Sequence, residues 1–213
     1  MAKKKLQRFA ELQTFPNVFQ QQRGLKGNWH RDYFHNDNPI ILELACGKGE
    51  YTVAMAQRFP NKNYVGVDIK GARLWRGAKE SLSLKLSNVA FIRIPIETIS
   101  EWFAPGEVDE IWITFPDPFP REGKARKRLT SPRFLDLYEK ILKQGGIIHL
   151  KTDEANLFRF TQEVIHARPG KILRIIEDLY KEHISDELLS IQTTYEKKHL
   201  ADNRTIRYVC FSI

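Results

Sequence analysis

Residues 40–49 read IILELACGKG, a short apolar run followed at once by a turn with two glycines. The run 40–44 has the length and the side chains of a strand that is buried on both faces. Gly47 and Gly49 let the backbone pass close to a ligand, and a helix starting at about residue 50 offers free N–H groups there. The segment therefore predicts the strand–loop–helix unit of an α/β fold, with a ligand site at the loop.

Six more apolar runs predict strands at 63–68, 89–94, 110–114, 147–151, 172–176 and 206–211. Helical patterns fall between them, at 50–58, 71–84, 132–143 and 155–167. For the helix at 132–143 we expect Ser131 as N-cap, Pro132 as first residue and Gly145-Gly146 as the stop. This alternation predicts an α/β fold, doubly wound around a mainly parallel sheet of seven strands.

The composition is that of a globular protein, with 213 residues of which 42% are hydrophobic and 28% charged. Two cysteines cannot make a disulfide framework, and no apolar run reaches the ~20 residues of a membrane span. The basic start lacks the apolar stretch of a secretory signal. The six histidines show no metal-ligand spacing. We therefore expect a cytoplasmic protein without a metal site or membrane contact.

The net charge of +8 comes from two segments. Residues 1–35 and residues 119–133 each carry a net +5, whereas 36–118 carry −2 and 134–213 carry zero. We expect a basic N-terminal arm at 1–35, disordered in part, ahead of a domain at 36–213. Clustered cations favour a polyanion through counterion release. The alternative is a solvated loop that aids solubility.

The glycine loop has a partner in Asp68, which ends the second predicted strand 19 residues after Gly49. A carboxylate there can accept hydrogen bonds from two ribose hydroxyls. Thr52 stands where a dinucleotide fingerprint has its third glycine, so a nucleoside without phosphate fits better. S-adenosylmethionine is such a ligand, and Glu43 adds negative charge where its methionyl part would lie. The alternatives are a tight turn with glycines for packing, and a helix cap for Asp68.

Residues 114–120 read TFPDPFP and leave the fourth predicted strand as a stiff loop, because three prolines continue neither a sheet nor a helix. Ligands bind at this edge of an open α/β sheet. Asp117 is thus held beside the cofactor site, and Phe115 and Phe119 can stack on a base. The alternatives are core packing for Phe119 and a turn cap for Asp117. The basic run that follows favours a nucleobase held for chemistry.

The segments FPDPFPR (115–121) and RKRLT (126–130) together closely resemble the signature of bacterial tRNA (guanine-N7-)-methyltransferases. Supporting motifs follow in order: ELACGKG (43–49), GVD (66–68), KTD (151–153) and TTYE (193–196). The resemblance implies a Rossmann-like class I methyltransferase fold whose last strand is antiparallel. It also implies S-adenosylmethionine as methyl donor and tRNA as substrate, methylated at N7 of guanine 46 in the variable loop.

The resemblance also implies roles for individual residues. Cofactor-binding positions are Glu43, Asp68 and Asp117, and Asp117 is also the catalytic residue. Substrate-binding positions are Arg121, Asp153, Thr193, Thr194, Tyr195 and Glu196. From the charge pattern we expect the tRNA phosphates at Lys124, Arg126, Lys127 and Arg128.

The sequence departs from the family pattern at four positions. Ala45 replaces a common glycine, Phe119 the usual tryptophan and Lys124 a common histidine. Pro95 falls where the family has an acid or amide near the adenine, so the Ile96 backbone or Glu97 is expected to substitute. Two other functions stay open: a methyltransferase of a small molecule, which leaves the basic segments without a purpose, and a non-enzymatic RNA-binding protein. The sequence does not choose between monomer and homodimer.

Overall fold

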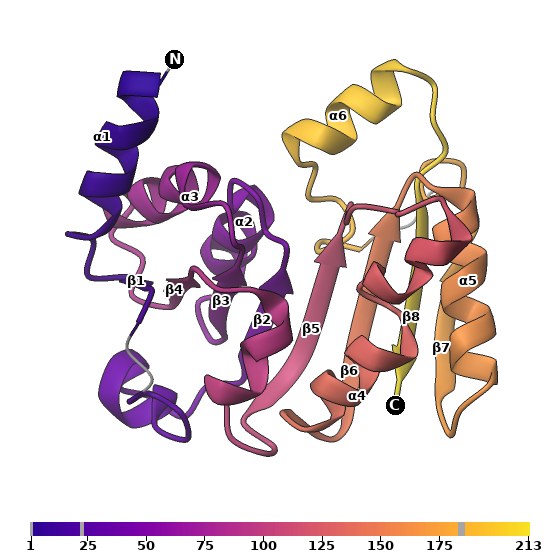
Figure 1. Cartoon of the computed structure of the whole chain (residues 1–213), viewed down its shortest axis with the longest axis horizontal. Coiled ribbons are helices and arrows are strands. Elements are labelled where there is room, and N and C mark those ends of the chain that lie inside the picture. The colour runs from indigo at the N-terminus through magenta and orange to yellow at the C-terminus, as the bar shows by residue number, and fades with distance from the viewer. Residues whose placement is uncertain (1, 22–23, 183–185) are drawn as a thin grey trace.

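One sheet organises the computed structural model, which describes residues 2–21, 24–182 and 186–213. Eight strands of these residues lie in the order β1-β4-β3-β2-β5-β6-β8-β7 (Figure 1). The first six in this order are parallel, and β8 is antiparallel to both neighbours. The strands are β1 (Val18–Phe19), β2 (Ile40–Leu44), β3 (Asn63–Val67), β4 (Val89–Ile92), β5 (Val108–Thr114), β6 (Leu142–Thr152), β7 (Lys171–Ile176) and β8 (Arg207–Ser212).

Two apolar cores lie on the two faces of the sheet, because successive residues of each strand point to opposite sides. In β2, Ile40 and Leu42 face one core and Ile41 the other. The helices are α1 (Ala2–Leu12), α2 (Glu50–Arg58), α3 (Gly71–Ser83), α4 (Pro132–Glu139), α5 (Ala155–His166) and α6 (Thr194–Ala201), with short turns at His30–Phe34, Ile96–Glu101 (η2) and Glu122–Lys127 (η3). The first core is closed by α4, α5 and the 3-10 helix η2, and the second by α2 and α3.

The predicted α/β class, the mainly parallel sheet and the antiparallel last strand are confirmed. The prediction of seven strands was one short, because β1 adds a two-residue parallel edge beside β4. The prediction of a helix over 132–143 was wrong at its end. The helix stops at Glu139, and Leu142 already pairs with Val108 in the sheet. Gly145-Gly146 lies inside β6, beside the register shift between Val108 and Glu110, and not at a helix stop.

The N-terminal segment predicted as a basic arm contributes buried side chains to both cores, Trp29 to the first and Leu12 to the second. Trp29 is fully buried, stacks on Phe103 and donates from its ring nitrogen to the Trp102 carbonyl at 2.9 Å. Helix α1 lies along α3, where the Trp75 ring nitrogen donates to Glu11 at 2.9 Å. Residues 1, 22 and 23 of this segment lie outside the described residues.

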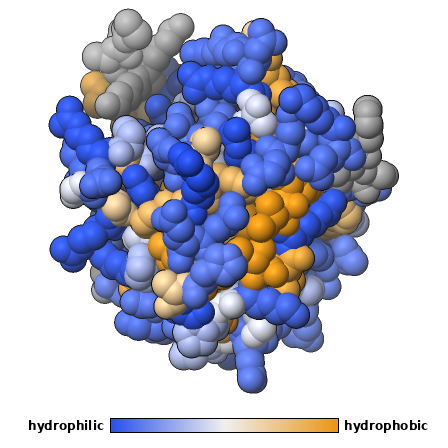
Figure 2. Space-filling view, turned by 90° about the vertical axis from the view of Figure 1, so that its right-hand side faces the viewer, coloured by the Kyte–Doolittle hydropathy of each residue, from blue (hydrophilic) through white to orange (hydrophobic). Residues whose placement is uncertain are grey.

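Strand β7 forms one edge of the sheet, and no other described strand pairs with its outer side. Leu173 and Ile175 of this strand are 45% and 41% exposed. Figure 2 views the molecule from that side and shows apolar side chains gathered there between hydrophilic ones. None of the helices in the described ranges has the length and apolar character to cross a membrane.

Candidate functional site

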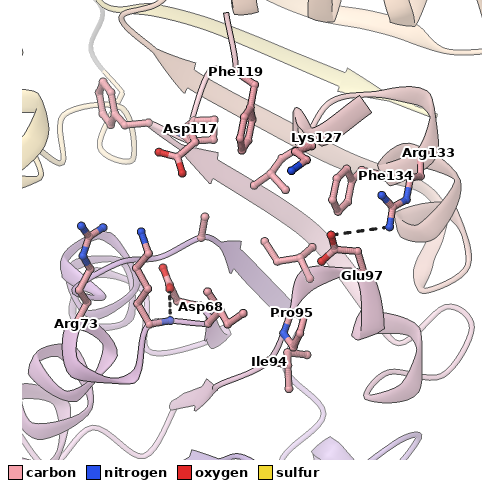
Figure 3. A pocket seen from close by; sticks show the side chains of 17 residues that line it. Asp68, Arg73, Ile94, Pro95, Glu97, Asp117, Phe119, Lys127, Arg133 and Phe134 are labelled. Atoms are coloured by element: carbon pink, nitrogen blue, oxygen red, sulfur yellow. Dashed lines mark hydrogen bonds and ion pairs between the residues drawn. The ribbon is translucent and has the colours of Figure 1, made fainter. Parts of the chain in front are cut away.

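A cleft of about 340 Å³ opens where four parallel strands end. Its walls come from the residues that follow β2, β3, β4 and β5, and from η3 and the start of α4. Strands β2 and β5 are neighbours, and the chain runs from β2 to β3 on one side and from β5 to β6 on the other. The cleft therefore lies at the topological switch point, where open α/β sheets bind their ligands. Figure 3 shows the carboxylates of Asp68 and Asp117 entering it from opposite walls.

The Asp68 carboxylate is held in place by two backbone N–H groups. One oxygen accepts from Gly47 at 2.8 Å and the other from Lys70 at 2.7 Å. Asp68 is thus fixed at the cleft wall, 7% exposed, with lone pairs left for a ligand. Gly47 has φ +58° and lines a smaller hollow beside the cleft.

Gly49 is the N-cap of α2, has φ +70° and is buried. A Cβ at this position would stand 2.6 Å from a ring carbon of Phe91 and 3.2 Å from the Cα of Gly77. Gly49 therefore allows α2 and α3 to approach each other above β4. The structure gives this glycine a packing reason, which was the alternative weighed for the loop.

Glu43 lies under the glycine loop and is 2% exposed. One carboxylate oxygen accepts from the N–H and the hydroxyl of Thr52, and the other accepts from the Thr114 hydroxyl at 2.7 Å. Burial raises the pKa of Glu43 to about 7, although these hydrogen bonds oppose the rise. Glu43 lines the smaller hollow with Gly47, and the hollow shares Ala45 and Phe115 with the main cleft.

The loop after β5 carries Asp117 on the cleft wall. Its two phenylalanines take left-handed backbone angles, φ +49° at Phe115 and φ +42° at Phe119. The Phe115 N–H donates to the Lys151 carbonyl at 2.8 Å, which continues the β5–β6 pairing into the loop. Asp117 is exposed and makes no hydrogen bond or ion pair with any described residue. Its carboxylate is therefore free to meet a ligand.

The wall after β4 is formed by Pro95, Ile96 and Glu97. Ile96 opens η2, so its N–H belongs to a helix start and has no partner within the helix. The Glu97 carboxylate is 3.8 Å from the Arg133 guanidinium, a contact drawn in Figure 3. Both groups that were expected to substitute for a side-chain acceptor at Pro95 thus reach the cleft.

The stretch 193–196 forms the start of α6, with Thr194 and Tyr195 exposed and Thr193 and Glu196 buried. Thr193 caps the helix, accepting from the Glu196 N–H at 3.1 Å. Thr194 donates its N–H and its hydroxyl to Glu50 of α2, both at 2.5 Å. Tyr195 is 41% exposed and lines the smaller hollow with Thr193. Three of these four residues therefore stand on or beside the site.

Glu196 reaches neither the cleft nor the hollow, because its side chain is completely buried. It pairs with Lys151 of β6, whose side chain is also fully buried, at 2.7 Å. The Lys151 ammonium donates as well to the carbonyls of Leu189 and Ile191, at 2.9 and 3.1 Å. Burial lowers the pKa of Lys151 and raises the pKa of Glu196, while their mutual attraction opposes both shifts. The pair ties the 189–196 segment to the sheet.

Asp153 follows β6 and is paired within the protein. Its carboxylate is 2.7 Å from the Arg204 guanidinium and 3.3 Å from the His199 ring, and its side chain is 7% exposed. The His199 ring stacks on Phe115 with centroids 5.7 Å apart. Asp153 thus connects to the Asp117 loop through His199, and it lines neither the cleft nor the hollow.

The basic segment lies at the rim of the cleft, and its cations differ in their exposure to solvent. Arg121, Lys124, Arg126 and Lys127 are exposed, and Lys127 lines the cleft. Arg128 is only 7% exposed and turns inward. No acidic side chain among the described residues pairs with the four exposed cations. They are therefore available to an external anion.

A second set of cations beside the cleft was missed by the sequence interpretation. Lys70, Arg73, Arg76 and Lys79 are exposed at intervals of three residues along α3, and the first two line the cleft. The spacing of the first two was a usable signal, because Lys70 caps α3 and a residue three positions further lies on the same side of a helix. It was hidden because residues 36–118 as a whole carry a net −2.

Comparisons with known proteins place this fold and this cleft in the class of methyltransferases. Residues 37–209 match a family model described as putative methyltransferase, and the chain belongs to that family. Solved structures with the same fold include an antibiotic-related methyltransferase, with TM-score 0.64 at 19% identity over 84% of this chain and 90% of that one. A 16S rRNA (adenine(1408)-N(1))-methyltransferase from Catenulisporales acidiphilia, solved with its cosubstrate SAM, has TM-score 0.57 at 13% identity over 87% and 90%.

Relatives of higher sequence identity show which family of methyltransferases this is. The tRNA (guanine-N(7)-)-methyltransferase of Porphyromonas gingivalis is 51% identical over 95% of this chain and 86% of the relative. The protein of the same name from Christiangramia forsetii is 48% identical over 100% of this chain and 99% of the relative. The chain therefore belongs to the tRNA (guanine-N(7)-)-methyltransferase family, as the resemblance predicted.

Proposed function

We propose that this protein transfers the methyl group of S-adenosylmethionine to N7 of guanine 46 in the variable loop of tRNA. The observation that carries the proposal is one cleft in which two carboxylates, Asp68 and Asp117, face each other between two sets of unpaired cations. The first carboxylate suits a ribose, the second suits a base that becomes cationic, and the cations suit the phosphates around that base.

The residues present fit S-adenosylmethionine. Asp68 keeps lone pairs for the ribose hydroxyls, and the wall formed by Ile94, Pro95 and Ile96 is largely apolar, as an adenine requires. Glu43 and the smaller hollow lie on the side of the glycine loop, where a carboxylate suits the cationic methionyl part. No third glycine leaves room for a pyrophosphate, because Thr52 is buried in α2 and bonded to Glu43.

When bound, S-adenosylmethionine supplies an electrophilic methyl group: a new bond forms from the N7 lone pair to the methyl carbon as the carbon–sulfur bond breaks and its electron pair stays on sulfur. Guanine N7 carries no proton, so Asp117 has no proton to remove. Its role is electrostatic, because the exposed carboxylate stabilises the positive charge that the base gains. It also accepts from N–H groups of guanine, which orients the ring.

Transfer RNA is held by cations on two sides of the cleft. On one side stand Arg121, Lys124, Arg126 and Lys127, and on the other Lys70 and Arg73 at the start of α3. Because none of them is paired within the described chain, each can displace a counterion from a phosphate. A small acceptor would use neither set, which favours RNA over a small molecule. Thr194 and Tyr195 lie nearby on α6 and add polar and aromatic contacts.

Methyl transfer tests the proposal directly. Labelled S-adenosylmethionine is incubated with the protein and unmodified tRNA, and the labelled nucleoside and its position are identified. We expect N7-methylguanosine at position 46, and no label in the same tRNA with adenine 46. Transfer to a small molecule alone, or RNA binding with no cofactor binding, contradicts the proposal and supports one of the two other functions considered from the sequence.

Cofactor affinity is expected to rise with pH between 6 and 8, because the pKa of Glu43 is about 7 and only the ionised form attracts a cation. An increase of about tenfold corresponds to about 1.4 kcal/mol of attraction. Calorimetric titration with S-adenosylmethionine at several pH values measures it. The Glu43→Gln variant is the control for titration of the cofactor itself. An equal pH dependence in wild type and variant contradicts a contact of Glu43 with the cofactor.

A further inference from the structure

Arg128 closes the basic run 121–128 but differs from the other cations in it. Its side chain is buried, with 7% exposure, and its guanidinium lies 4.4 Å from the centre of the Phe160 ring on α5. No carboxylate of the described residues pairs with it. A positive charge buried without an anion requires other polar partners. The position of those partners indicates what Arg128 does.

The partners of Arg128 are the backbone carbonyls that directly follow Asp117. Its Nε donates to the Pro118 carbonyl at 3.2 Å and to the Phe119 carbonyl at 3.3 Å. Its Nη2 donates to the Phe119 carbonyl at 3.2 Å. The guanidinium therefore holds the loop immediately after the residue to which the proposed mechanism assigns the electrostatic role.

The loop needs such a partner because its own sequence gives it few backbone bonds. Pro116, Pro118 and Pro120 have no N–H to donate. Phe115 and Phe119 stand in the left-handed region, which L-residues with a Cβ adopt only when their surroundings hold them there. Among the described residues, Arg128 is the only one whose side chain forms hydrogen bonds to residues 117–120.

We propose that Arg128 is a positioning residue that fixes the Asp117 loop and does not bind tRNA phosphate. The inference rests on the proposed function of Asp117. An arginine suits this task better than a lysine, because its planar fork reaches both carbonyls while its face stacks on Phe160. From the sequence, Arg128 was predicted to bind tRNA phosphate together with its neighbours. We assign it a positioning role instead, because its side chain is buried and bonds to backbone carbonyls.

The test uses Arg128→Lys, which keeps the charge but loses the fork, and Arg126→Ala as the matched variant from the same run. For Arg128→Lys we expect kcat with tRNA to fall about tenfold, as small displacements of reacting groups do. The salt slope of tRNA binding should stay unchanged. For Arg126→Ala, which removes an exposed phosphate-binding cation, we expect a raised KM for tRNA and a salt slope lower by about 0.7 to 0.9.

A double-mutant cycle with Asp117→Ala distinguishes positioning from a general structural effect. If Arg128 acts through Asp117, Arg128→Lys should change kcat less than twofold in the Asp117→Ala protein. A full tenfold loss in that background overturns the inference. So does a reduced salt slope with unchanged kcat in Arg128→Lys alone, because that result identifies a phosphate ligand.

Hydrogen exchange tests the inference without any substrate. The Phe115 amide, which donates to the Lys151 carbonyl where the loop begins, should exchange faster in Arg128→Lys than in wild type, and at the wild-type rate in Arg126→Ala. Wild-type protein that methylates no tRNA refutes the proposed function, yet the exchange rates still decide whether Arg128 holds the loop. Equal exchange in all three proteins overturns the inference even when the wild type is active.

Discussion

Asp117→Ala is expected to leave the fold intact and to lower kcat for tRNA methylation by roughly 10²- to 10³-fold, the loss typical when one preorganised electrostatic group is removed. The fold should survive because Asp117 is exposed and bonds to no described residue. The rate should fall because the carboxylate is the free negative group on the loop wall of the cleft, where guanine gains positive charge. Single-turnover kinetics measure the loss, and circular dichroism checks the fold.

Two further variants separate charge from shape. Asp117→Asn keeps the size and one acceptor oxygen but removes the charge, so it should lose nearly as much as alanine. Glu122→Ala removes an exposed carboxylate five residues further along that does not line the cleft, and its rate should match that of the wild type. Near-normal turnover in Asp117→Ala, or an equal loss in Glu122→Ala, would rule out the catalytic role.

The cleft was predictable because it follows from the order of strands along the chain. Asp68 and Asp117 each come directly after a parallel strand, and parallel strands that share a sheet end at the same edge. Their approach across one cleft thus required only the prediction of two strands. The short apolar runs made those strands recognisable, since a strand covered on both faces has no polar side.

The end of the predicted helix at 132–143 shows where a local pattern is insufficient. Ile141 and Leu142 continue the helical stripe of α4, but they also suit a strand, and pairing of Leu142 with Val108 prevailed. Pairing between strands that are distant in the sequence cannot be recognised from the residues of one short segment. Helix α6, in contrast, had a local signal that was not used, because Thr193 and Glu196 are spaced as in a capping box.

Charge in a sequence does not show which way a side chain points. Arg126, Lys127, Thr194 and Tyr195 are exposed, whereas Arg128 and Glu196 in the same two motifs are buried. Each has a partner from a distant segment: Phe160 for the first and Lys151 for the second. Residue types therefore identified the two motifs, while the division into ligand-facing and buried members required the tertiary contacts.

Glu196→Gln is expected to lower the free energy of unfolding by about 3–5 kcal/mol, because it leaves the Lys151 ammonium buried without a counter-charge. Chemical denaturation at pH 7 measures the loss. Glu187→Gln, at an exposed position of the same C-terminal region, is the matched control and should change little. Lys151 also donates to the carbonyls of Leu189 and Ile191. A shift of its ammonium group should therefore weaken the attachment of the segment leading to α6 as well.

The dependence of this loss on pH identifies its cause. Without the Glu196 carboxylate, only the charge of Asp186 still opposes the effect of burial, so the pKa of Lys151 falls further below the ordinary value of 10.5. The folded variant then binds fewer protons than its unfolded chain, so its free energy of unfolding increases as the pH rises toward 10.5. The difference from wild type should therefore shrink on going from pH 7 to pH 10.

The same variant decides how the 193–196 motif serves the substrate. If Glu196 acts by holding α6, Glu196→Gln should weaken tRNA binding only together with the loss of stability, and its binding should recover at higher pH as the fold tightens. If Glu196 itself contacts tRNA, binding should weaken with stability unchanged at every pH. Because the carboxylate already accepts from Lys151 and Tyr180, we expect the first result.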